Sequence, residues 1–332
     1  MMKITKLLLG CFLYTAVAGQ DVHFSQFYNM PLLRNPGLSG IFNAQYQASA
    51  LYRNQWGSIS AAFQTMALGA EVKVIGPSLT DPFSLTLGLQ VVRDQVGAAN
   101  FTRTAYMPNI SGRLSLANGM YISAGFLAGP VTSTLNVNNL TWSDEYVNGI
   151  FTGITNQPFG FTQKNYFDLG AGVVLGSSDP DATQWYAGIA SYHLNKPSVG
   201  VGQNNDLPVR LSINGGLGLK LAEDERLFFY GDGILQGTQY EYLFGGMYTK
   251  YFVDDNDENE EGISFGAFYR WNDAIVPTVR LSYDKWVVGF SYDFNVSQLA
   301  AGSKVWGGPE LTVKFKGFAS AAKALNCPRG TL

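Results

Sequence analysis

The chain has 332 residues, which is enough for one large domain or two ordinary ones. Charged residues make up only 14%, against about 25% in ordinary soluble proteins, and the net charge is −3. The absence of a basic excess argues against nucleic-acid binding, and a hydrophobic content of 46% excludes intrinsic disorder. Beyond about the first 20 residues, no apolar run reaches the roughly 18 that a membrane-spanning helix needs. The abundant glycine and aromatic residues are instead typical of a membrane β-barrel.

The amino terminus has the pattern of a secretory signal peptide. Lys3 and Lys6 precede an apolar stretch at 7–17, and Ala16-Val17-Ala18 is a small-residue cleavage site. We therefore expect residues 1–18 to be a signal peptide that is cleaved after Sec-dependent export. In the alternative interpretation, Leu8-Leu9-Gly10-Cys11 is a lipobox and Cys11 carries a lipid. Only about four apolar residues would then precede the cut, fewer than the usual 7–15.

A stretch without periodicity follows, from Gln20 to Gly40. It is dense in aromatic, proline and turn residues, which a disordered tail would lack. We therefore expect residues 19–41 to form an ordered, plug-like periplasmic segment, inside the lumen of the barrel or at its periplasmic mouth.

From Phe42 onward the apolar residues recur with period two, as in β-strands. At 83–91 and 288–294, for example, apolar residues alternate with glycine, polar or charged ones. A soluble sandwich could show the same alternation. The runs, however, are about 10–14 residues long, against about 5–6 in soluble strands, and they end in aromatic residues. These features favour an all-β, transmembrane antiparallel barrel at 42–317, with a periplasmic tail at 318–332.

About 14 strands are predicted, an even number as in single-chain outer-membrane barrels. Both barrel ends are placed on the periplasmic side, so that the longest connection, about 133–163, faces outward with the other long loops. Pro277 indicates an irregular strand. The predicted strands are 42–53, 58–75, 83–93, 102–115, 119–132, 164–176, 184–194, 208–220, 226–236, 240–252, 262–271, 275–283, 285–295 and 308–316.

The long loop is unusual because it combines many aromatic residues with few charges. Such a loop either packs into the barrel mouth or contacts a protein. On the second interpretation, its aromatic side chains are candidate contacts for secreted cargo, because buried aromatic residues dominate interface energetics. The candidates are Trp142, Tyr146, Phe151 and Phe159.

Few residues are suited to catalysis or metal binding. The chain has two histidines, of which His193 shares a strand face with Ser191, but no third member of a triad can be identified. The acidic run at 254–261 lacks the glycine and the final acidic residue of a calcium loop, and is interpreted as a solvated turn. After signal cleavage Cys327 is the sole cysteine, either inert or in contact with a partner. We predict no enzyme activity, no cofactor and no metal site.

Several motifs occur in an order that matches a known family. The opening segment contains a D-x-x-F-S-Q-F motif followed by N-P-G-L-S-G, and later motifs follow along the chain. The residues concerned are Phe24, Ser25, Gln26, Asn35, Pro36, Arg53, Gln55, Trp56, His193 and Asn195. The stretches 289–297 and 307–311 are similar to the last hairpin of the family, and Asn326-Cys327-Pro328-Arg329 to its Cys-Pro-basic ending. Here Gly330-Thr331-Leu332 replaces the expected aromatic stop.

In these motifs the chain resembles the PorP/SprF family of type IX secretion system membrane proteins. The resemblance implies an outer-membrane barrel that serves export of surface cargo, notably SprB-like adhesins with a carboxy-terminal sorting domain, and that supports gliding motility. It also implies partners in the type IX translocon or the periplasmic ring, and no catalytic residues.

Two functional hypotheses follow. In the first, the chain is a non-enzymatic secretion component that binds cargo at loops 133–163 and 295–307, with its lumen closed by residues 21–40. In the second, it is an outer-membrane channel or a transporter of hydrophobic substrates. The lumen-facing positions carry mainly glycine and small polar residues with sparse charge, whereas a porin needs an open, charge-lined interior.

Overall fold

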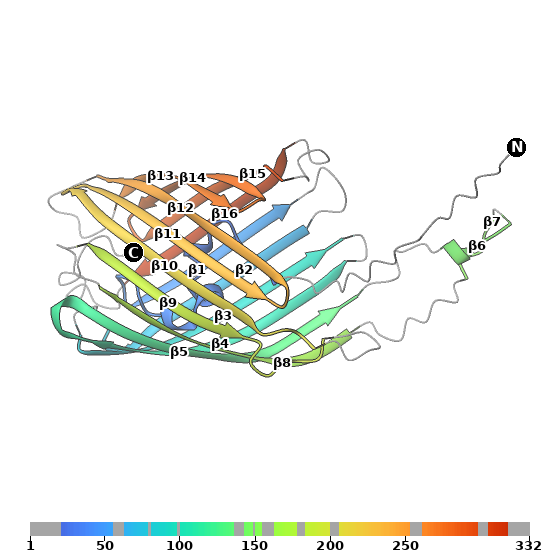
Figure 1. Cartoon of the computed structure of the whole chain (residues 1–332), viewed down its shortest axis with the longest axis horizontal. Helices are drawn as coiled ribbons and strands as arrows, with labels where there is room; N and C mark the ends of the chain where they lie inside the picture. Colours follow the sequence, from blue (N-terminus) through green and yellow to red (C-terminus); the bar gives the residue numbers. More distant parts are fainter. Residues whose placement is uncertain are drawn as a thin grey trace, which may run out of the picture.

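The computed structural model consists of a β-barrel with an amino-terminal segment inside it (Figure 1). It describes residues 21–55, 63–78, 81–97, 100–135, 143–148, 150–154, 163–177, 183–199, 206–252, 261–297 and 305–317. The predicted signal peptide and carboxy-terminal tail, with Cys11 and Cys327, lie outside these residues, as does most of the acidic run at 254–261.

Fourteen antiparallel strands close the barrel in the order β1-β16-β15-β14-β13-β12-β11-β10-β9-β8-β5-β4-β3-β2. Their bounds are β1 Tyr46–Gln55, β2 Phe63–Ile75, β3 Phe83–Val96, β4 Phe101–Ser115, β5 Met120–Thr134, β8 Gln163–Ser177, β9 Gln184–Tyr192, β10 Arg210–Ala222, β11 Glu225–Gln236, β12 Gln239–Tyr251, β13 Gly262–Arg270, β14 Ala274–Tyr283, β15 Trp286–Asn295 and β16 Trp306–Gly317. A separate hairpin joins β6 (Tyr146–Val147) to β7 (Ile150–Phe151). The short helices are η1 Phe27–Asn29, α1 Pro31–Arg34, η2 Pro36–Leu38, η3 Ala117–Gly119 and η4 Ser143–Glu145. In the described part of the chain, no helix has the length and apolar character to cross a membrane.

The predicted fold is confirmed, and each of the fourteen predicted strands overlaps an observed one. The alternation has the expected cause. Outward positions carry large apolar side chains that stay exposed on the isolated chain, and inward positions are buried. The outward set includes Leu68, Ile110, Phe126, Ile213, Phe265 and Phe290.

The differences from the predicted strands lie mainly at strand ends. Residues 42–45 are not part of β1, because they still belong to the segment that leaves the lumen. Strand β9 ends at Tyr192, because the next residue, His193, takes a left-handed conformation with φ 57°. Pro277 interrupts the β14–β15 ladder as expected, since Ile275 and Thr278 pair with β15 while the two residues between them do not.

The barrel has two rims. The near rim carries the first and last barrel residues, Tyr46 and Gly317, which pair with each other. The far rim carries the other ends of the same strands, including Gln55 and Trp306. The two longest connections, 135–162 and 193–209, lie at the far rim, which also has a two-residue connection at 237–238. No near-rim connection between barrel strands exceeds ten residues, and those at 223–224 and 284–285 have two. This distribution is the loop asymmetry of outer-membrane barrels.

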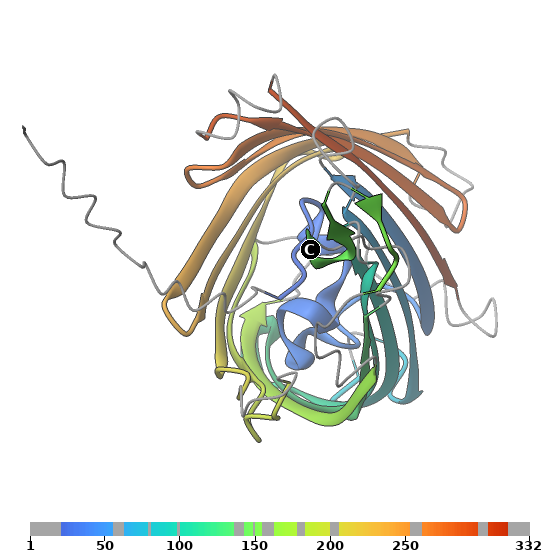
Figure 2. The same cartoon turned by 90° about the vertical axis from the view of Figure 1, so that its right-hand side faces the viewer.

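Residues 21–44, here called the lumen segment, lie inside the barrel (Figure 2). The segment starts at the far rim, where Asp21 contacts Arg210 at the first position of β10. It ends at the near rim, where the backbone N–H of Gln45 donates to the carbonyl of Gly317 at 2.9 Å. The chain therefore traverses the whole lumen before β1 begins.

Apolar side chains of the lumen segment complete the core of the barrel. Phe27 packs edge-on against Phe268, with ring centroids 5.7 Å apart, and Tyr28 stacks on Tyr230 at 5.0 Å. Phe24 and Met30 form a second buried cluster with wall residues on the opposite side. Burial of each such side chain contributes roughly 1.5–3 kcal/mol, so the segment and the wall stabilise each other.

Candidate functional site: the anchored lumen segment

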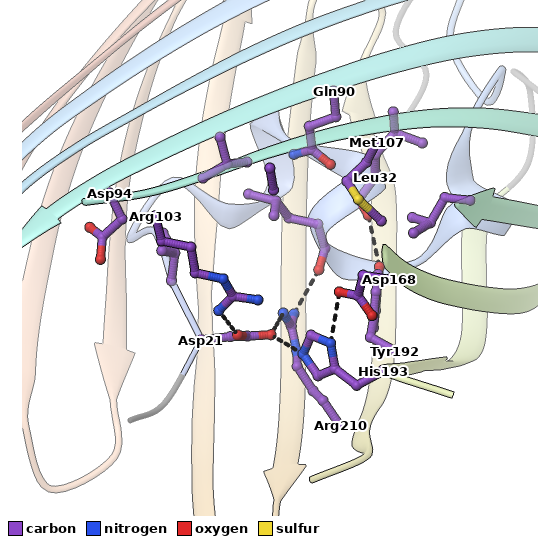
Figure 3. Close-up of a pocket in the computed structure, with 15 residues that line it drawn as sticks. Asp21, Leu32, Gln90, Asp94, Arg103, Met107, Asp168, Tyr192, His193 and Arg210 are labelled. Atoms are coloured by element: carbon purple, nitrogen blue, oxygen red, sulfur yellow. Dashed lines mark hydrogen bonds and ion pairs between the residues drawn. The ribbon is translucent and has the colours of Figure 1, made fainter. Parts of the chain in front are cut away.

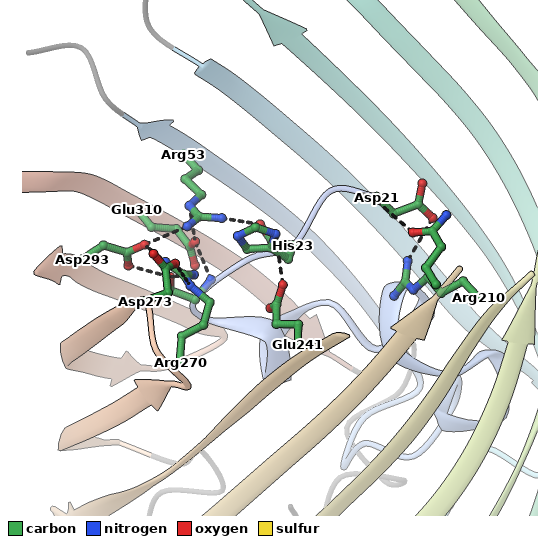
Figure 4. A network of polar contacts seen from close by, with 11 residues as sticks. Asp21, His23, Arg53, Arg210, Glu241, Arg270, Asp273, Asp293 and Glu310 are labelled. Atoms are coloured by element: carbon green, nitrogen blue, oxygen red, sulfur yellow. Dashed lines mark hydrogen bonds and ion pairs between the residues drawn. The ribbon is translucent and has the colours of Figure 1, made fainter. Parts of the chain in front are cut away.

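The first anchor of the lumen segment is a carboxylate of the wall that accepts two backbone N–H groups. Glu310 on β16, labelled in Figure 4, accepts from the N–H of Ser25 at 2.8 Å and from that of Gln26 at 2.6 Å. The side-chain amide of Gln26 donates in turn to the backbone carbonyl of Glu310. Ser25, Gln26 and Glu310 are almost fully buried. Because an unpaired buried N–H is costly, this arrangement fixes the position of the segment.

A second buried carboxylate joins the segment to the strands at which the barrel closes. Asp293 on β15 accepts from the Ser25 hydroxyl at 2.6 Å, from Arg53 on β1 at 2.7 Å and from Arg270 on β13 at 2.6 Å. Arg53 also lies 3.8 Å from Glu310. The two buried guanidinium groups are thus paired with carboxylates, and Arg270 also contacts the less buried Asp273 at 2.5 Å.

His23 lies beside this cluster, with its Nδ1 3.3 Å from a carboxylate oxygen of Glu241. Burial, reinforced by the cations Arg53 and Arg270, lowers the pKa of His23 well below its ordinary value. The neutral imidazole is therefore favoured, and the contact with Glu241 is not an ion pair of opposite full charges.

A separate cluster at the far rim surrounds Asp21. The carboxylate of Asp21 contacts Nε2 of His193 at 2.6 Å, Arg103 at 2.6 Å and Arg210 at 3.3 Å (Figure 3). Nδ1 of His193 contacts Asp168 on β8 at 2.8 Å. The imidazole is therefore held between one carboxylate of the lumen segment and one of the wall.

The electrostatics of this cluster favour the charged forms of Asp21 and His193. Burial alone would raise the pKa of Asp21, but Arg103, His193 and Arg210 hold it well below its ordinary value. Burial alone would lower the pKa of His193, but Asp21 and Asp168 outweigh that effect and raise the pKa. The imidazolium is thus stabilised at the far rim by its two carboxylate partners.

The middle of the segment is held by Arg34. Its guanidinium donates to both carboxylate oxygens of Asp232 on β11, with N–O distances of 2.6–3.0 Å. It also lies over the ring of Phe27 at 4.8 Å and near that of Tyr186 at 5.6 Å. The ion pair and the two aromatic rings thus compensate the positive charge of the guanidinium inside the lumen.

The Asn-Pro dipeptide of the segment lies against glycines of the wall. Asn35 caps η2 by accepting from the N–H of Gly37 at 2.8 Å, and its amide donates to two wall carbonyls at 3.0 and 3.1 Å. A Cβ at Gly172 would lie 2.0 Å from the Asn35 side chain, and one at Gly125 would lie 2.2 Å from the Pro36 carbonyl. The wall therefore needs glycine at both positions to admit the segment.

Between segment and wall lies a far-rim cavity of about 70 Å³. Its inner part is apolar, and Asp21, His193 and Arg210 lie at its polar end. Its apolar lining includes Leu32, Leu33, Val92, Met107 and Leu127. Among the described residues, no group of three or more histidine, cysteine or acidic side chains is placed to hold a metal ion.

The family-motif residues fall into two groups. Phe24, Ser25, Gln26, Asn35 and Pro36 contact the wall from within, and Arg53 and His193 receive the segment at the far rim. Asn195 instead donates to the carbonyl of Phe167 at the surface, and Gln55 ends β1. Trp56 lies outside the described residues.

The aromatic loop residues lie apart from the lumen. Tyr146 and Phe151 face each other across the β6–β7 hairpin, 5.3 Å apart and about half exposed, beyond the far rim (Figure 1). Trp142 and Phe159 lie outside the described residues.

The charged partners in the lumen were not anticipated. The lumen-facing positions were expected to carry sparse charge, yet Asp168, Arg210, Asp232, Arg270, Asp293 and Glu310 are all buried there. One sequence signal could have identified these residues: each is a single charged residue at a strand position that alternates with the apolar, outward-facing ones. The serine–histidine pair also differs from expectation, because the turn at His193 directs its ring to two carboxylates.

Comparison with the solved structure of a transporter barrel supports the fold. The toluene transporter TbuX of Ralstonia pickettii is similar over 90% of this chain and 96% of its own, with a TM-score of 0.51 and 10% identity. A FadL homologue of Pseudomonas aeruginosa is similar over 85% of this chain and 92% of its own, with a TM-score of 0.48 and 9% identity. At 10% identity, the likeness to TbuX concerns the fold alone. A search of curated protein sequences found no significant match.

The family is shown by the sequence as a whole. The model of the type IX secretion system membrane protein PorP/SprF matches residues 16–315, which include the lumen segment and nearly the entire barrel. The fold and this match fit a location in the outer membrane. The chain therefore belongs to the PorP/SprF family of type IX secretion system membrane proteins.

Proposed function

We propose that this chain is a closed, non-enzymatic component of the type IX secretion system, which binds cargo on the cell surface and machinery in the periplasm. The observation that carries this proposal is the lumen segment, which is anchored by polar contacts of Asp21 and Ser25 on the far side and of the Phe42 carbonyl with Lys73 at the near rim. A barrel whose interior is filled by its own chain is suited to act as a scaffold for other proteins rather than as a pore.

The orientation follows from the loops. Short connections belong to the periplasmic side of outer-membrane barrels and long ones to the outside. The near rim then faces the periplasm, where the translocon or ring components would bind, and the far rim faces outward. Export would follow the Sec route with cleavage after Ala18.

The cargo site would be the β6–β7 hairpin. Its apolar side chains are more than half exposed, with Ile150 at 69% and Tyr146 at 53%. Exposed apolar groups gathered on one projecting element mark an interaction site. The cargo would be large surface proteins of the SprB-like adhesin type, recognised through their carboxy-terminal sorting domain, and gliding would depend on their display.

The decisive experiment compares the proteins of the cell surface and the culture medium with and without the gene. Loss of one or a few large surface proteins, with other export intact, supports cargo-specific secretion and identifies the cargo. Loss of all type IX cargo indicates a general role in the machinery. No change in either fraction contradicts the proposal.

The loop assignment is tested by replacing the hairpin residues Tyr146 and Phe151, together with Trp142 of the same loop, with alanine. We expect reduced cargo retention with an intact barrel, because truncation of an aromatic anchor typically costs 2 kcal/mol or more of binding free energy. Tyr240→Ala is the matched control, since this exposed tyrosine lies at the far rim outside the loop. Unchanged retention in the triple variant would show that cargo binds elsewhere.

A second candidate function is passage of small hydrophobic molecules, and TbuX is described as a toluene transporter. The observation in its favour is the apolar far-rim cavity beside the lumen segment. Planar-bilayer recordings separate the two functions of the wild-type protein. Stable open steps favour transport, and silence favours the closed scaffold.

A further inference from the structure

The barrel wall is interrupted between β4 and β5. Ala105 pairs with Val131 and Asn109 with Leu127, but the three residues between them on each strand are not paired with each other. The same residues pair without interruption with their other neighbours, β3 and β8. The interruption is therefore confined to one interface of the wall, here called the β4–β5 seam (residues 106–108 and 128–130).

Two prolines account for the seam. In the register of the two strands, Pro108 stands opposite residue 128, and Pro130 stands opposite residue 106. Neither proline has an N–H group, so two donors of the ladder are missing. Next to Pro130 lies Gly129, where a Cβ would collide with the carbonyl oxygen of Tyr106. The seam is thus closed by close backbone contact with fewer hydrogen bonds than a continuous ladder, and local opening costs less there.

The far-rim cavity lies directly behind the seam. Met107 belongs to the seam, Leu127 adjoins it, and both line the cavity from the wall. Across the cavity, the lumen segment contributes Leu32 and Leu33. The volume of about 70 Å³ is several times the roughly 10–15 Å³ that one water molecule needs. Because most of this lining is apolar, a hydrocarbon group fills the space better than water does.

The outer face of the seam lies where the wall changes from apolar to polar. Tyr106, Pro108 and Pro130 are exposed at this level. The outward positions of β4 and β5 are large and apolar toward the near rim, and they are threonines toward the far rim. The first set contains Ile110, Leu114, Ile122 and Phe126, and the second contains Thr102, Thr104, Thr132 and Thr134. The seam therefore lies at the edge of the apolar band, where a molecule with an apolar body and a polar end would collect.

Two buried donors that line the cavity lack acceptors. Among the described residues, the side-chain amide nitrogen of Gln90 and Nε of Arg210 have no hydrogen-bond partner. Gln90 lies on the side of Met107, and Arg210 lies on the side of Asp21 (Figure 3). The terminal nitrogens of Arg210 donate to Asp21 and to the carbonyl of Leu33. Because an unpaired buried donor is costly, a ligand that brings an acceptor oxygen is favoured.

The charges at the polar end of the cavity favour an uncharged ligand. Asp21 is paired with Arg103 and Arg210, and the imidazole of His193 lies between Asp21 and Asp168. A charged ligand would have to break one of these pairs and leave its other member without a partner, which is costly in a buried site.

We propose that the far-rim cavity binds a small, uncharged amphiphile, a short hydrocarbon chain with an acceptor oxygen, which enters from the membrane through the β4–β5 seam. The chain packs among Leu32, Met107 and Leu127, and the oxygen accepts from Gln90. This site requires neither bound cargo nor an open lumen, so it is independent of both functions considered above.

The site is tested by photolabelling the mature protein in lipid nanodiscs with a diazirine derivative of 1-hexanol. Mass spectrometry should find the label on residues that line the cavity, and 1-hexanol should compete. Leu127→Phe fills the cavity and should lower labelling severalfold. Gln90→Leu should weaken competition by 1-hexanol by roughly a factor of two to ten, because one hydrogen bond is lost. Ile110→Phe is the matched control, since it enlarges an exposed side chain on the lipid face of β4.

The entry route is tested by the rate of labelling after rapid addition of the probe. Pro108→Ala/Pro130→Ala restores both missing N–H groups and should slow labelling of the cavity, because the ladder can then close. Pro277→Ala is the matched control, since it restores an N–H in the interrupted β14–β15 ladder, away from the cavity. This variant should be labelled at the wild-type rate.

The binding site is contradicted if the label does not reach the cavity, or if Ile110→Phe lowers labelling as much as Leu127→Phe does. Unchanged competition in Gln90→Leu contradicts it as well, and this nearly isosteric variant keeps the test valid if Leu127→Phe does not fold. The entry route is contradicted if Pro108→Ala/Pro130→Ala is labelled as fast as Pro277→Ala. Circular dichroism of each variant verifies that the barrel is folded.

Discussion

The ion pair between Arg34 and Asp232 offers the sharpest test of how the lumen is closed. Asp232→Asn removes the negative charge but keeps the shape of the side chain. The side chains of both partners are only 5% exposed, so the surface rule for ion pairs does not apply. Removal of one partner of a buried pair leaves an uncompensated charge and costs about 3–5 kcal/mol.

This cost falls mainly on the docking of the lumen segment, because Arg34 belongs to the segment and Asp232 to the wall. At 1.4 kcal/mol per factor of ten, the population with a displaced segment should rise roughly a hundredfold to a few thousandfold. Planar-bilayer recording measures this change directly. The wild type should be silent, and Asp232→Asn should show transient openings.

The matched variant is Arg34→Leu/Asp232→Leu, which removes both charges. Replacement of a buried pair by apolar residues is often neutral or stabilising, and the rings of Phe27 and Tyr186 already surround Arg34. We therefore expect the double variant to stay closed. The electrostatic reasoning would be refuted if Asp232→Asn gave no more channel openings than the wild type. It would also be refuted if the double variant opened as often as Asp232→Asn.

Two further predictions concern packing and pH. Gly125→Ala should displace η2 and destabilise the segment by about 1–3 kcal/mol, because its Cβ would lie 2.2 Å from the Pro36 carbonyl. Limited proteolysis within residues 21–44 measures this effect, and Gly112→Ala, whose Cβ would lie 3.6 Å from the Phe83 ring, should match the wild type. The raised pKa of His193 means that its contribution to stability is complete below about pH 6.5 and is lost as the pH rises through the folded-state pKa. The lowered pKa of Asp21 has the opposite sense, so its contribution is present above its ordinary pKa and is lost in acid. Thermal midpoints between pH 6 and 9 should therefore fall with pH in the wild type but stay flatter in His193→Gln, and parallel curves would contradict this assignment.

The sequence predicted the barrel well because each strand carries its own signal. Alternation at 83–91 or 288–294 is a local property, and lipid enforces it on every strand. The ordered state of residues 21–44 was also predictable, since a disordered segment would not be so rich in aromatic residues and proline. The family motifs also identified Ser25, Gln26 and Asn35 as candidate site residues, but a motif does not indicate which residues they contact.

The partners of those residues could not be predicted, because they depend on how distant strands meet in the closed barrel. Ser25 and Glu310 are separated by 285 residues in sequence, and no local pattern pairs them. His193 reaches Asp21 only through a backbone turn with positive φ, which strand periodicity does not anticipate. The assignment of cargo contacts to Tyr146 and Phe151 stays a prediction.

The contacts of Ser25 with Glu310 and Asp293 constrain the order in which the barrel assembles. Strands β1 and β16 close the barrel, and the anchor uses Arg53 from β1, Asp293 from β15 and Glu310 from β16. The lumen segment is synthesised first, yet its binding site is complete only when the last strand has been delivered. Insertion of the segment and sealing of the wall are therefore coupled steps of assembly, limited by contacts of very high sequence separation. A barrel that fails to seal would leave the segment without its anchor, and the exposed residues 21–44 would then distinguish an unfinished molecule from a mature one.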